Sequence, residues 1–110
     1  MSRPLTLRLT DTAESDLAEI WFYVAGEASE AAATRLIDKI KDACEPLRHF
    51  PESAPLREHF APGLRAAFSS NYAIYYVHDE RELVIVRVLH GARDAPALAA
   101  HGGFVIRDER

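Results

Sequence analysis

The sequence predicts an α+β fold in which a hairpin of two helices packs on a small, mainly antiparallel β-sheet. A short segment of period two opens the chain, two amphipathic helical segments follow, and three strand-like segments complete the order β-α-α-β-β-β. The length of 110 residues and the hydrophobic fraction of 48% allow a single core. We therefore expect one domain over residues 1–95 and a partly disordered tail over 96–110.

The first strand and the first helix are predicted from two different periods. Leucines alternate with polar residues over 5–9, which indicates a strand with one buried face. Asp11 and Glu14 have the spacing of a helix N-cap and its capping-box partner. Apolar residues then recur at helical spacing until Gly26, so the first helix is expected from about 12 to 25.

The second helix is expected over 30–49, with Ser29 as its N-cap. Its apolar stripe includes Ile40, Cys44 and Leu47, and Pro46 should kink the last turn or make it irregular. Cys44 is the single cysteine, so it cannot form an intramolecular disulfide. We expect it to be a small buried hydrophobe, as fits a reducing cytoplasm.

The second half of the chain predicts a loop and a three-stranded meander. Residues 51–63 contain three prolines and a glycine, which indicates an ordered surface loop. Strands are expected over 64–69, 72–78 and 83–89, with Ser70 and Asn71 in the first turn. The last strand is the most apolar, which is typical of an inner strand. Its one cation, Arg87, should pack its stem on the sheet and pair with an acid.

Charge and composition restrict the function. The net charge of −4 argues against a surface that binds nucleic acid mainly by neutralising phosphates, so a protein partner is favoured. No apolar run approaches the ~20 residues of a membrane span, and the amino end lacks the apolar run of a signal peptide. The five histidines lack ligand-like spacing, so we expect neither a metal site nor a cofactor. These features predict a cytoplasmic protein.

Four segments resemble the ParE branch of the ParE/RelE toxin superfamily. They read LTDTAESDLAEIWFYVA, AAATRLIDKIKDACEPLRHFP, GLRAAFSSNYAIYYVHD and IVRVLHGARD, and they keep the order and spacing of that family. The resemblance implies the toxin of a type II toxin–antitoxin module, bound in a hetero-oligomer by a ParD-like antitoxin. ParE-type toxins poison DNA gyrase, whereas RelE-type relatives cleave messenger RNA on the ribosome. Both activities are therefore open.

The resemblance also bears on the nuclease chemistry. RelE-like nucleases use a basic cluster on the sheet and a tyrosine near the carboxyl end. The corresponding cations here are Arg65 and Arg93, but Ala67 and Ala73 occupy two other positions and no tyrosine follows Tyr76. We therefore expect no catalytic residue and favour a toxin that binds gyrase. The alternatives are a ribosome-dependent endoribonuclease with a reduced site, and an inactive homologue in an autorepressor complex.

Two groups of candidate contact residues follow. The target-binding candidates are Arg65, His90 and Arg93; His90 and Arg93 have the alternative interpretation of a relic catalytic pair. Three consecutive helical residues span about 200°, so at least one of the aromatics over 21–23 must face outward. In the family, the antitoxin lays a helix on the hairpin and extended chain beside the sheet. The antitoxin-binding candidates are Leu17, Trp21, Phe22, Arg57, Tyr76 and Arg87.

Overall fold

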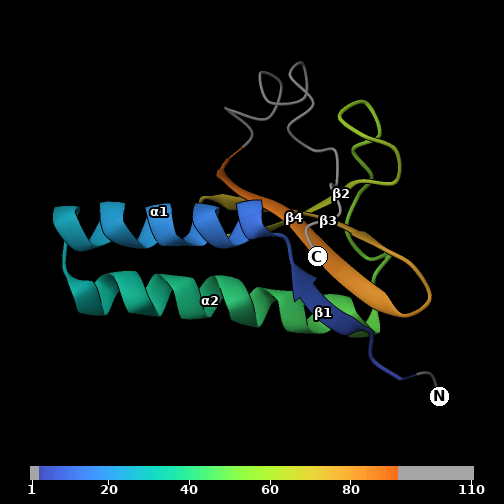
Figure 1. The fold of residues 1–110 in the computed structure, drawn as a ribbon, viewed down its shortest axis with the longest axis horizontal. Coiled ribbons are helices and arrows are strands. Elements are labelled where there is room, and N and C mark those ends of the chain that lie inside the picture. Colours follow the sequence, from blue (N-terminus) through green and yellow to red (C-terminus); the bar gives the residue numbers. More distant parts are fainter. Residues whose placement is uncertain (1–2, 92–110) are drawn as a thin grey trace.

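A hairpin of two helices lies on one face of a four-stranded sheet (Figure 1). The computed structural model describes residues 3–91, so the expectations for Arg93 and for the tail over 96–110 lie outside the described residues. The predicted α+β class and element order are confirmed. The elements are β1 (Thr6–Leu9), α1 (Asp11–Glu27), α2 (Glu30–His49), β2 (Arg65–Ser69), β3 (Tyr72–His78) and β4 (Glu82–His90).

The strands lie in the order β1-β4-β3-β2. The predicted meander is confirmed, because β2, β3 and β4 pair antiparallel in succession. The amino-terminal strand β1 pairs parallel with β4, with Leu7 opposite Leu83. The strand β4 is therefore an inner strand, as predicted, and β1 and β2 form the two edges of the sheet.

The helix termini differ from prediction at two points. Thr10, not Asp11, is the N-cap of α1, and its hydroxyl accepts a hydrogen bond of 3.0 Å from the N–H of Ala13. This helix also continues through Gly26 to Glu27. Ser29 caps α2 as predicted, and α2 continues past Pro46 to His49. Within residues 3–91, neither helix combines the length and the hydropathy needed to cross a membrane.

The sheet is buried on both faces. The helical face packs against one cluster, which includes Leu17, Ile40, Cys44, Leu47, Tyr76, Ile85 and Val88. Residues of the opposite face pack with part of the loop over 51–63, in a cluster that includes Leu64, Ala66, Tyr75, Val86 and Phe60. Cys44 is buried as predicted. The two clusters account for the nearly continuous apolar sequence of β4.

A β-bulge interrupts the pairing of β3 with β4. Tyr75 lies opposite Arg87 but Tyr76 lies opposite Ile85, so Val86 is the extra residue on β4. Bulges bend a strand and re-aim its side chains. The bulge follows the point where β1 ends, because the last residue of β1 pairs with Ile85. From Val86 onward, β4 therefore needs another element to bond the backbone edge that β1 no longer pairs with.

Candidate functional site

The described residues contain an apolar groove between the helical hairpin and β1. Its volume is about 240 Å³, and most of its lining is aliphatic. The lining residues are Leu7 and Leu9 of β1, Glu14 and Leu17 of α1, Ile40, Lys41 and Cys44 of α2, and Ile85 and Val88 of β4. Burial raises the pKa of Cys44 from 9.0 to about 11, so its thiol is protonated at neutral pH and adds to the apolar surface.

The groove borders an edge of the sheet that is closed at only one end. Leu5 donates its N–H to the carbonyl of Arg48 at 2.9 Å, and the Nε of Arg48 donates to the carbonyl of Leu5 at 2.7 Å. Backbone groups alternate between the two sides of a strand, so those of Leu7 and Leu9 face the same outer edge as Leu5. Within the described residues, no hydrogen bond closes this edge at Leu7. An extended peptide could therefore pair here.

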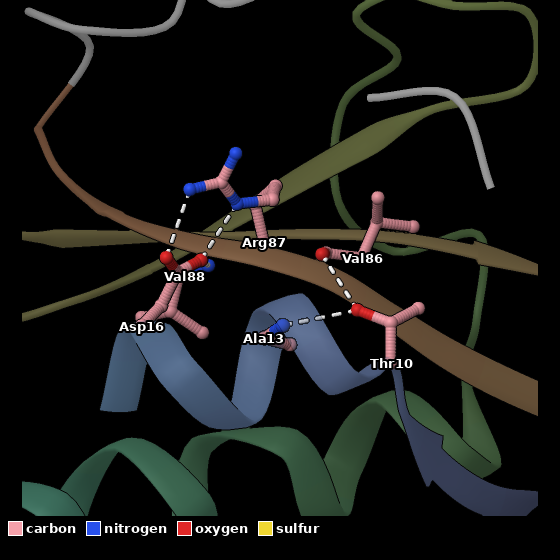
Figure 2. Close-up of polar contacts among 6 residues, drawn as sticks. All are labelled: Thr10, Ala13, Asp16, Val86, Arg87 and Val88. Atoms are coloured by element: carbon pink, nitrogen blue, oxygen red, sulfur yellow. Dashed lines mark hydrogen bonds and ion pairs between the residues drawn. The ribbon is translucent and has the colours of Figure 1, made fainter. Parts of the chain in front are cut away.

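Beyond the end of β1, the backbone edge of β4 that β1 leaves unpaired is closed by Thr10 and α1, as Figure 2 shows. The hydroxyl of Thr10 donates to the carbonyl of Val86 at 3.0 Å, and Asp16 accepts the N–H of Val88 at 3.0 Å. Asp16 also accepts two hydrogen bonds from Arg87, both at 2.8 Å. The predicted pairing of Arg87 with an acid is confirmed. These bonds prevent strand addition along this part of β4.

The ion pair with Asp16 gives Arg87 a structural role, because it joins β4 to α1. Hydrogen bonding to Asp16 raises the pKa of the guanidinium, which opposes the effect of its burial. The side chains of Arg87 and Asp16 are 15% and 9% exposed. Arg87 therefore uses two of its five N–H groups on Asp16, and its low exposure restricts the access of a partner to the others.

The structure separates the residues that sequence reasoning assigned to the target. The Arg65 guanidinium donates to the carbonyls of Glu52 and Ala54 at 3.3 and 2.7 Å, so it holds the loop over 51–63. His90 is exposed at the other end of the sheet, where its ring and that of Tyr72 pack perpendicular to each other with centroids 5.3 Å apart. The pairing partners of Arg65 and His90 are Tyr76 and Tyr72, which are four positions, or roughly 13 Å, apart on β3.

The antitoxin candidates lie in several environments. Tyr76 has no exposed surface, because its ring belongs to the core and its hydroxyl donates to the carbonyl of Pro51 at 2.7 Å. Leu17 is buried but lines the groove. Arg57 is half-buried and donates to the carbonyl of Leu56 at 3.0 Å. The assignment of Tyr76 to a contact surface is therefore wrong for this structure.

The aromatic residues of α1 divide between the fold and the solvent. Trp21 is half-buried, and its Nε1 donates to the hydroxyl of Thr34 on α2 at 3.1 Å. Phe22 and Tyr23 are 71% and 66% exposed. The expectation that at least one of the three faces outward is confirmed. Trp21 and Phe22 remain candidates for a partner contact.

Known proteins share both the sequence pattern and this fold. The model of the family described as "ParE toxin of type II toxin-antitoxin system, parDE" matches residues 7–95. The chain belongs to the ParE toxin family. Its fold is similar to a structure of the chromosomal ParDE toxin–antitoxin system from P. aeruginosa, with a TM-score of 0.70 and 19% identity over 79% of this chain and 96% of that chain.

A second solved structure is the RelBE2 toxin–antitoxin complex from Mycobacterium tuberculosis. It has a TM-score of 0.55 and 27% identity to this chain, and the similarity covers 80% of this chain and 99% of that chain. A comparison with curated proteins finds no match. The ParE assignment therefore comes from the family model, and the solved structures support the superfamily fold.

Sequence reasoning about this ParE-family chain missed the groove and its edge. The alternation over 5–9 predicts that Leu7 and Leu9 face the core, and their side chains do line the apolar groove. It does not predict that the helices leave space beside them. The only sequence signal was that β1 is short, because edge strands are often short.

Proposed function

We propose that this ParE-family toxin acts in the cytoplasm by binding DNA gyrase and trapping it on cleaved DNA, and that a ParD-like antitoxin neutralises it. Family membership supports a toxin of a type II module. The complexes that share its fold contain toxin–antitoxin pairs, which supports an antitoxin partner.

One observation favours a binding toxin over a nuclease: no cationic cluster of the nuclease type is assembled on the described sheet. RNA cleavage through the 2′-hydroxyl requires a base, an acid and cations around the phosphate. Arg65 is bound to loop carbonyls, and Ala67 and Ala73 cannot supply charge or protons. His90 lies at the far end of β3 from Arg65.

Among residues 3–91 the edge at Leu7 is unpaired, and this edge and the groove suit an extended segment of the antitoxin. Such a segment would pair with the backbone of Leu7 and Leu9 and extend the sheet beyond β1. An apolar side chain on its inner face would enter the groove and contribute most of the affinity. Glu14 and Lys41 have opposite charges and line the same groove, so they would favour antitoxin residues of complementary charge beside that anchor.

A matched pair of substitutions tests this antitoxin site. Leu7→Ala removes lining from the groove, whereas Thr6→Ala alters an exposed neighbour on the same strand. Calorimetric titration with the antitoxin encoded beside the toxin should show affinity about tenfold weaker for Leu7→Ala and nearly unchanged for Thr6→Ala. Equal affinities for the two variants would exclude the groove as the anchor site.

Induced expression without antitoxin tests the toxic activity. Gyrase poisoning should produce filamentous cells and induction of the DNA-damage response before protein synthesis declines. An early arrest of translation with messenger cuts in the ribosomal A site would favour the nuclease alternative. Normal growth at a verified level of folded toxin would favour the inactive homologue.

A further inference from the structure

The second half of α1 presents a surface that the fold does not use. The last buried residue of α1 is Leu17, and the joined ends of α1 and α2 extend past the sheet (Figure 1). The hydrogen bond from Trp21 to Thr34 joins the two helices in this extension. The ring of Phe22 packs edge-to-face with that of Trp21, with centroids 5.3 Å apart, yet Phe22 and Tyr23 are 71% and 66% exposed. Two adjacent exposed aromatics on a helix are typical of a contact site.

Two carboxylates of α1 accompany these aromatics, and α1 contains neither lysine nor arginine. Glu19 precedes Tyr23 by four residues and Glu27 follows it by four, so both lie on its side of the helix. No salt bridge in the described part of the chain involves Glu19 or Glu27, although Glu19 exerts a longer-range attraction on Arg87. These two carboxylates are thus available to a cationic partner.

We propose that Glu19, Phe22, Tyr23 and Glu27 form the surface that holds the target protein, through a target segment that carries lysine or arginine. This inference rests on the proposed function, because it takes the toxin to act by binding a protein. The carboxylates would attract the cations and set the register of the segment. The aromatic faces would hold a cation or an adjacent apolar side chain.

Other occupants fit this surface less well. Nucleic acid and anionic lipid would be repelled by the carboxylates. A second copy of the chain would bring another acidic α1 against the first. The groove proposed for the antitoxin is lined by residues from the first half of α1 and the second half of α2, whereas the joined ends of the two helices form the extension (Figure 1). The toxin therefore has separate places for an apolar extended segment and for a cationic one. Phe22, which sequence reasoning assigned to the antitoxin, is thereby assigned to the target.

Paired variants of the full chain test the inference. Glu19→Gln with Glu27→Gln removes the two charges, and Asp38→Asn with Asp42→Asn removes two exposed charges from α2 as a control. Phe22→Ala with Tyr23→Ala removes the aromatic surface, and Phe50→Ala removes an exposed aromatic elsewhere as its control. For each variant, one would measure folding by circular dichroism, the toxin level that arrests growth, and the dissociation constant for the antitoxin.

We expect the two α1 variants to need at least about tenfold more toxin for growth arrest, with antitoxin affinity within about threefold of the unaltered chain. The controls should match the unaltered chain in both measurements. Unchanged toxicity of folded α1 variants would overturn the inference, and so would an equal loss of toxicity and antitoxin affinity.

The same experiment separates failure of this inference from failure of the proposed function. If the unaltered chain arrests growth without stabilising gyrase cleavage complexes, the proposed target is wrong, while the growth measurement still tests the α1 surface. If the unaltered chain does not arrest growth at all, both proposals are wrong.

Discussion

Asp16→Ala should be among the most destabilising single substitutions in the protein. Asp16 is 8% exposed and accepts three hydrogen bonds, two from Arg87 and one from the N–H of Val88. Alanine would leave a mostly buried guanidinium without its counter-ion and a strand N–H without an acceptor. Breaking a buried ion pair from one side costs about 3–5 kcal/mol, which is a large fraction of the ~5–15 kcal/mol that stabilises a domain.

Urea unfolding followed by circular dichroism measures this loss. We expect a decrease of about 3–5 kcal/mol in the free energy of unfolding and a decrease of at least ~12 °C in Tm. Glu19→Ala, which alters an exposed carboxylate of the same helix, should stay within about 0.5 kcal/mol. Asp16→Leu combined with Arg87→Met should recover part of the loss, because apolar groups need no counter-ion, while the N–H of Val88 stays without its acceptor. A loss below about 1 kcal/mol for Asp16→Ala would refute this reasoning.

Three further predictions concern the core and the toxic activity. Burial raises the pKa of Cys44 from 9.0 to about 11, so the thiol ionises at lower pH in the unfolded chain than in the folded protein. The free energy of unfolding, compared with that of Cys44→Ala, should therefore fall as the pH rises from 9.0 towards 11, and urea unfolding at several pH values measures this. Tyr76→Phe should lose about 1 kcal/mol with the hydrogen bond to Pro51, measurable as a lower urea midpoint. Arg93→Ala should reduce toxicity in growth assays and leave antitoxin affinity within about tenfold by calorimetry, and an equal loss of both would assign Arg93 to another surface.

Local sequence was sufficient to predict the elements of this fold, because periodicity defines the buried face of the helices and of β1, and the continuous apolar run of β4 reflects burial on both faces. The caps were less predictable where tertiary contacts contribute. Asp11 and Glu14 match a capping box, yet Thr10 is the N-cap, because its hydroxyl also bonds the carbonyl of Val86 across the sheet. Local sequence contains no information about a partner 76 residues away.

The candidate site was less predictable for the same reason. The sequence indicated that Arg87 needs an acid, but the chain contains 17 acidic residues, and only the packing of α1 on β4 selects Asp16. Arg65 looked free in the sequence because its partners are loop carbonyls rather than side chains. Tyr76 illustrates the same difficulty, since a tyrosine on a strand can face either a partner or the core.

Purified gyrase gives the most direct test of the proposed function. Toxin would be added to gyrase, ATP and supercoiled plasmid, and the linear DNA released by detergent and protease would be measured with and without antitoxin. The proposal predicts a dose-dependent increase in cleaved plasmid that the antitoxin abolishes. If folded, growth-arresting toxin left gyrase cleavage at its background level, gyrase poisoning would be contradicted.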